Sequence, residues 1–180
     1  MTRLLLGSFI AAVAVFMWGF VFYAASPAMS KVVKGTPDDA AAQAAIREHF
    51  PESGTYFVPS PDLPEDQLNT LHQAGPLALI NVRSEGGPVM DPMVLTWGFI
   101  HEWIVCFLLG WLLLRASLDS YGERVMFLTV AGFTAALFID YGGAIWWGID
   151  RGFALMNLFY NTVAWLVAGL VLAWKPGAEA

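Results

Sequence analysis

The chain has 180 residues, of which 57% are hydrophobic and only 13% are charged, and its net charge is −6. Soluble domains carry about 25% charged residues, so this composition indicates that lipid is the solvent for much of the chain. The acidic balance excludes the cationic face that nucleic-acid binding requires. Cys106 is the only cysteine, which excludes an intramolecular disulfide and a CxxC redox pair.

Four apolar segments are long enough to cross a bilayer, which takes about 20 residues. The first covers residues 1–25, and the others run over about 93–114, 125–147 and 152–174. The first could also be a secretory signal, but its apolar core exceeds the roughly 7–15 residues of a signal peptide. We therefore expect an all-α membrane protein with a four-helix transmembrane bundle. A three-span protein with the first segment cleaved is the alternative.

The positions of Lys and Arg predict the orientation, because short loops rich in these residues stay in the cytoplasm. Arg3, the Arg115–Arg124 connection and Lys175 fall on one side of the membrane. The 26–92 segment and the Gly148–Arg151 turn fall on the other side. Both termini are then cytoplasmic, and residues 26–92 form an extracytoplasmic domain between the first two helices.

Residues 26–92 hold nine of the ten prolines and are expected to form a small α+β domain. The run Thr36-Pro37-Asp38-Asp39 predicts a helix start with Thr36 as the cap. A few short elements in fewer than 70 residues are marginal alone, so we expect the domain to rest on the transmembrane helices or on a protein partner. The expected elements are a helix from Thr36 to about Phe50, strands at Gly54–Val58 and Leu77–Arg83, and a short helix over Pro64–Gln73.

Three short motifs carry a resemblance. They are Gly75-Pro76-Leu77-Ala78, then Glu85-Gly86-Gly87-Pro88-Val89-Met90 before the second span, and the leader Leu4–Tyr23 with its Trp18-Gly19. In these motifs the chain resembles a family of uncharacterised bacterial inner-membrane proteins, over the first two spans and the loop between them. The resemblance implies a bacterial inner-membrane location and this topology, and it implies no activity.

Polar residues inside the expected spans form the candidate site. Ionisable groups in a span cost roughly 2.5–3.5 kcal/mol each on insertion scales, so each needs a partner or a function. Arg151 and Asp150 cap the outer end of the layer that these residues form. The five that fall inside the outer half of the bilayer are His101, Glu102, Asp140, Asn157 and Asn161. The candidate residues are His101, Glu102, Asp140, Asn157, Asn161 and Arg151.

Helical geometry predicts how these residues pair. Asn157 and Asn161 are four apart and share a face, whereas His101 and Glu102 point about 100° apart and are not expected to face one narrow point. We expect His101 to pair with Asp140, with both asparagines nearby. Small residues predict close helix packing within the chain, in the first span at Gly7, Ala11 and Ala14 and in the third at Gly132 and Ala136.

The polar layer has two interpretations. It is either interhelical packing, in which the groups satisfy each other, or a site where Glu102 or Asp140 relays a proton or binds a small polar ligand with His101 as its partner. No metal is expected, because His101 with one or two carboxylates offers too few ligands. No cofactor is expected either, because nucleotide-binding motifs are absent and only one histidine lies in the spans.

The lack of any reaction motif favours a non-enzymatic accessory or assembly subunit that presents its loop domain to a periplasmic protein partner. A small transporter, or a carrier of protons or lipids, is the first alternative. It would require a homo-oligomer, because transporters usually contain more spans. The second alternative is a membrane enzyme acting on a lipid-linked substrate at the outer leaflet. Membrane lipids are expected partners in every case, and nucleic acid in none.

Overall fold

The computed structural model describes residues 1–174, and these divide into two compact units. We call Met1–Val33 together with the chain from Met90 onward the membrane unit, and Lys34–Val89 the loop unit. Residues 26–33, expected in the loop domain, belong instead to the membrane unit, where the short helix α2 (Ala28–Val32) packs on the last long helix. Lys175, which entered the orientation argument, lies outside the described residues.

Four helical segments of the membrane unit are long and apolar enough to cross a membrane, which confirms that part of the prediction. The third begins four residues before the expected 125, because Ser120 and Glu123 form a capping box that starts the helix at Tyr121. Two segments contain a π-helical turn, a rare form that often marks functional sites. The segments are α1 (Thr2–Phe20) with η1 (Val21–Ala25); α5 (Pro92–Arg115); α6 (Tyr121–Ala136) with η2 (Leu137–Tyr141) and α7 (Gly142–Trp146); and α8 (Arg151–Leu172).

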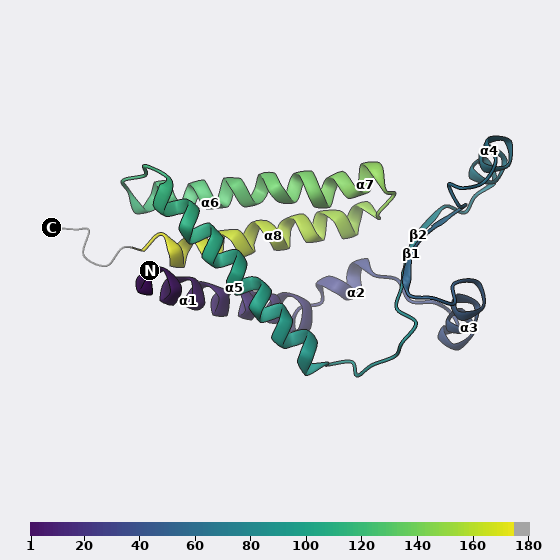
Figure 1. The fold of residues 1–180 in the computed structure, drawn as a ribbon, viewed down its shortest axis with the longest axis horizontal. Helices are drawn as coiled ribbons and strands as arrows, with labels where there is room; N and C mark the ends of the chain where they lie inside the picture. Colours follow the sequence, from purple (N-terminus) through teal and green to yellow (C-terminus); the bar gives the residue numbers. More distant parts are fainter. Residues whose placement is uncertain (175–180) are drawn as a thin grey trace. The chain divides into compact units, whose positions relative to one another are not determined.

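The long helices pack in an order that differs from their order in the chain. The last helix, α8, lies against both α6 and α1, and α1 lies against α5. Helix α5 crosses the others obliquely and makes only slight contact with α8 (Figure 1). Although α5 and α6 are consecutive, they are not a packed pair within residues 1–174. The helices thus form a row in the order α5, α1, α8, α6 and not a closed ring of four.

Small residues let the helices of this row approach closely. Ala11 and Ala12 of α1 are fully buried in the core, whereas Gly7 has open space around it, so the expected seam on α1 does not include Gly7. On α6, a Cβ atom added to Gly132 would lie 2.3 Å from the Cβ atom of Trp165. The predicted close packing at Gly132 is therefore a contact between α6 and α8.

The loop unit contains two helices and a two-stranded antiparallel sheet, with Gly54 opposite Val82 and Val58 opposite Ala78. The sequence predicted all four elements. The helix cap differs, because Asp38 and not Thr36 accepts the backbone N–H of Ala41, at 3.0 Å. Aspartate is at least as good a cap as threonine, so the later residue takes this role. The elements are α3 (Asp39–His49), β1 (Gly54–Val58), α4 (Glu65–Ala74) and β2 (Ala78–Val82).

The loop unit has no core of its own. None of residues 34–89 is buried, and neither α3 nor α4 makes more than slight contact with the sheet. One ring contact, between Phe50 and Tyr56 at 5.0 Å, links the end of α3 to β1. Neither helix of this unit is therefore packed on its sheet.

Candidate functional site

The two asparagines of α8 connect it to the helices on both of its sides. Asn161 donates a hydrogen bond from Nδ2 to Oδ2 of Asp140, at 2.8 Å. Asn157 accepts one at Oδ1 from the hydroxyl of Tyr23, at 3.2 Å. Both partners lie in π-helical turns, Asp140 in η2 and Tyr23 in η1. Both asparagines were expected beside Asp140; Asn161 bonds to it, whereas Asn157 bonds to Tyr23 on the other neighbour of α8.

The expected pairing of His101 with Asp140 is not found. Asp140 bonds to Asn161, and Nδ1 of His101 lies 3.9 Å from Oε1 of Glu102. The reason is the order of the helices: α5, which carries His101, packs on α1, whereas the segment that carries Asp140 packs on α8. Arg151, at the first position of α8, is exposed and has no hydrogen bond or ion pair within the described chain. Asp150, expected with Arg151 at this end of the polar layer, is the N-cap of α8 and accepts from the backbone N–H of Phe153 at 3.0 Å.

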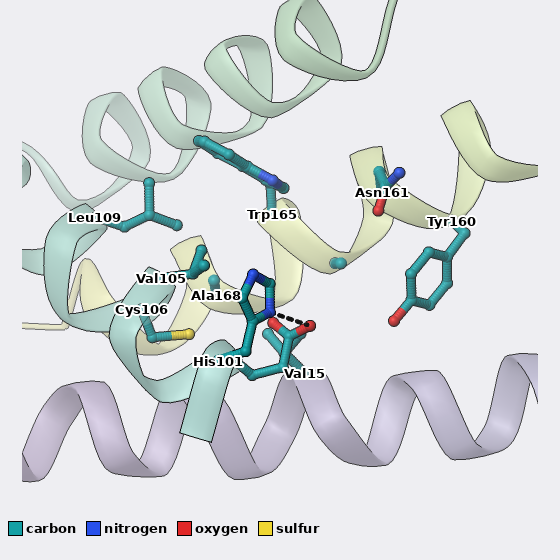
Figure 2. A pocket seen from close by; sticks show the side chains of 11 residues that line it. Val15, His101, Val105, Cys106, Leu109, Tyr160, Asn161, Trp165 and Ala168 are labelled. Carbon is teal, nitrogen blue, oxygen red and sulfur yellow. Dashed lines mark ion pairs between the residues drawn. The ribbon is translucent and has the colours of Figure 1, made fainter. Parts of the chain in front are cut away.

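His101 and Glu102 line one cavity of about 210 Å³ between α5 and α8, with Val15 of α1 in its wall (Figure 2). These two residues, which point about 100° apart on the helix, thus both border this cavity, His101 with its side chain mostly exposed. Asn161 also lines the cavity, which links it to the Asp140 pair. The remaining lining residues are Val105, Cys106, Leu109, Tyr160, Ala164, Trp165 and Ala168.

The cavity has a polar end and an apolar end. Helices α5 and α8 run in the same direction, because one antiparallel segment separates them in the chain (Figure 1). In both helices the polar lining residues lie near the middle, and apolar lining residues such as Leu109 and Ala168 follow them toward the C-terminal end. Figure 2 shows Tyr160 and Asn161 at one side of the cavity and Leu109 at the other. From Asn161 to Ala168 the helix rises about 10 Å, which sets the length of this gradient.

Hydrogen-bond acceptors dominate the polar end. The Glu102 side chain is 28% exposed and that of His101 is 73% exposed. Asn161 uses only its Nδ2 in the bond to Asp140, so its Oδ1 has no partner within residues 1–174. The Tyr160 hydroxyl likewise has no hydrogen bond in this part of the chain, and Gly19 leaves room for it, since a Cβ atom there would lie 3.0 Å from that oxygen. Among the described residues, no Lys or Arg lines the cavity.

Tyr160 and Trp165 were not among the residues that the sequence singled out. Trp18 of α1 donates its Nε1–H to the backbone oxygen of Tyr160 at 3.2 Å, and the two rings stack with their centroids 6.2 Å apart. The sequence signal that could have pointed to these two residues is a glycine on the facing helix. Gly19 faces Tyr160, and Gly132 faces Trp165. At these two glycines a large side chain of another helix fills the space that a Cβ atom would take, whereas Gly7 and Gly98 have open space there.

The groups that the site offers to a ligand are hydrogen-bond acceptors and aromatic rings. In the part of the chain that the structure describes, no three His, Cys, Asp or Glu side chains are grouped so that they could hold a metal ion. Cys106 is buried against the core and lies at the apolar end of the cavity.

Comparisons of the chain with models of protein families, with curated proteins and with solved structures find no match.

Proposed function

We propose that this protein is a non-enzymatic accessory or assembly subunit of the bacterial inner membrane. Its membrane unit anchors the chain, and its loop unit lies on the extracytoplasmic side and docks on a protein partner. The observation that carries the proposal is the absence of any buried residue between positions 34 and 89. A unit that presents every side chain to its surroundings is suited to a docking surface.

The loop unit loses conformational entropy when it folds, and little burial compensates for that loss. Fixing the backbone of a residue costs roughly 1–2 kcal/mol, which is normally offset by burial of apolar surface. A two-stranded sheet is marginal at best in water without a third strand or a helix packed on it. The loop unit has neither, so we expect that its apolar side chains become buried against the surface of a protein partner. Apolar side chains are exposed on or beside its elements for such contact, including Ile46, Leu71 and Leu77.

Charge indicates what kind of partner fits. Residues 34–89 contain eight acidic and three basic side chains, a net charge of −5. Because charge complementarity steers association and selects partners, we expect a basic protein surface with apolar pockets.

The location and the orientation rest on the sequence. The bacterial inner membrane is what the resemblance implies, through motifs such as Gly75-Pro76 and Gly86-Gly87. The extracytoplasmic placement of the loop unit rests on Arg3 and Arg115, which lie at the ends of their spans opposite to those that lead into residues 34–89.

The polar contacts of the membrane unit agree with a structural role. The bonds Asp140–Asn161 and Tyr23–Asn157 satisfy groups that would otherwise be unpaired in hydrocarbon, and they hold α8 to both of its neighbours. Residues engaged in this way stabilise the packing of the helices.

Native mass spectrometry of the protein extracted from its own membrane tests the proposal. We expect a second protein in stoichiometric amount. A variant with Glu48→Lys, Glu52→Lys and Asp62→Lys, all exposed in the loop unit, should lose that partner. The matched control carries Glu48→Asp, Glu52→Asp and Asp62→Glu, which keep every charge and should retain it. Extraction of the wild-type protein alone, or only with copies of itself, would contradict the proposal.

A further inference from the structure

We infer that the cavity between α5 and α8 binds the amine head of a single-chain cationic amphiphile, with its tail along the apolar end. This inference is independent of the proposed docking function, since it concerns only the membrane unit. It rests on the chemistry of the lining residues, on the direction of the polarity gradient and on the size of the cavity.

The lining selects a hydrogen-bond donor. Glu102 contributes a carboxyl group, and Asn161 contributes an amide oxygen that the bond to Asp140 leaves unused. Tyr160 adds a hydroxyl oxygen. An ammonium group has three N–H donors and no acceptor, so it matches a set of three oxygens. Phosphate and carboxylate heads do not match, because no Lys or Arg of residues 1–174 lines the cavity to balance a negative charge.

Two aromatic rings strengthen the preference for a cation. Trp165 and Tyr160 both line the cavity, and Figure 2 shows the Trp165 ring above His101 and the Tyr160 ring across the open space from it. The face of an aromatic ring attracts a positive charge, and this attraction grows when the cation is removed from water. A carboxyl group and two rings around one space are therefore a site for a cation and not for a neutral alcohol.

The apolar end and the volume define the rest of the ligand. Beyond the polar residues, the walls are Cys106, Leu109 and Ala168, which suit a hydrocarbon tail. The cavity of about 210 Å³ is smaller than the roughly 300 Å³ at which drug-sized pockets begin, so it fits one head and part of one chain but not a two-chain phospholipid. Because α5 and α6 are not packed together within the described chain, the row of helices leaves this side accessible from the lipid.

Binding of three probes with the same chain tests the inference: dodecylamine, dodecanol and dodecanoate, each added to the full-length protein in detergent and followed by native mass spectrometry. We expect dodecylamine to bind about tenfold more tightly than dodecanol, the gain typical of a charge-assisted contact. Dodecanoate should bind least. Equal binding of all three probes, or no binding of dodecylamine, would overturn the inference.

Variants separate the site from general partition of amines into the micelle. Glu102→Gln keeps the shape of the side chain and should remove the preference for dodecylamine over dodecanol. Glu102→Asp should retain it, and Glu52→Gln in the exposed loop unit is the control for net charge and should leave it unchanged. A preference for the amine that survives in Glu102→Gln would show that the cavity does not recognise the cation, and would overturn the inference.

Discussion

Asn161 and Asp140 are joined by a hydrogen bond of 2.8 Å that connects α8 to the π-helical turn η2. The bond gives the carboxyl group of Asp140 a donor from the neighbouring helix, where lipid offers none. His101 and Glu102 lie on α5, do not take part in this bond, and line the cavity together. The polar residues of the membrane unit therefore divide into a packing group and a cavity group, and Asn161 belongs to both.

The coupling between Asp140 and Asn161 can be measured by a double-mutant cycle with Asp140→Ala and Asn161→Ala. Interhelical hydrogen bonds in membrane proteins contribute about 0.6 kcal/mol on average and up to about 2 kcal/mol, so we expect a coupling free energy of about 1 kcal/mol. Unfolding of the purified protein by denaturant in detergent provides the free energies. The matched control is a cycle of Asp140→Ala with Asn157→Ala, which should show almost no coupling because Asn157 bonds to Tyr23.

Gly132→Ala should destabilise the protein by about 1–3 kcal/mol, the usual cost of overpacking. The added methyl group would lie 2.3 Å from the Cβ atom of Trp165, which is too close to the backbone of α8 to move freely. Gly98→Ala is the control within a helix, since its added Cβ meets no other part of the described chain within 4 Å beyond the adjoining backbone of its own helix. Alanine favours the helix by up to about 1 kcal/mol, so this variant should be as stable as the wild type or more so. Thermal unfolding in one detergent compares them, and equal midpoints for both variants would contradict the packing of α6 on α8.

Replacement of residues 34–89 by a flexible Gly/Ser linker should leave the membrane unit folded. A linker of about 15 residues spans roughly 20 Å, and no buried residue is lost with the loop unit. We expect the thermal midpoint to change little. A longer deletion that also removes α2 (Ala28–Val32) is the control, and it should lower the midpoint because α2 packs on α8. If the variant that lacks only residues 34–89 aggregates, the loop unit supports the folding of the helices.

Cysteine labelling in intact cells tests the orientation. Cys106 is the only cysteine and is buried, so the wild-type protein should not react with a membrane-impermeant maleimide. Gln73→Cys, exposed on α4, should react in intact cells if the loop unit is extracytoplasmic. Ser117→Cys, exposed in the connection between α5 and α6, should react only after the membrane is permeabilised. The reverse pattern would invert the proposed topology.

Local signals in the sequence determined the helices and strands of this protein. Runs of apolar residues predicted the four long helices, and the alternation and turn residues of the loop predicted β1 residue for residue. The start of the helix in the loop was recognisable from Thr36-Pro37-Asp38-Asp39, because capping depends only on residues next to each other, although Asp38 is the cap. These features were predictable because they arise from interactions between residues close together in the chain.

The tertiary structure alone decided which helices touch, and with it the partner of Asp140 and the existence of the cavity. In a soluble helix an apolar stripe shows which face is buried, but a helix surrounded by lipid is apolar on every side. Lipid chains are as apolar as leucine, so the hydrophobic effect does not determine whether α5 packs on α6 or on α1. That choice depends on the close fit of small and large residues, such as Gly132 against Trp165, and such pairs become visible only when the helices are placed side by side.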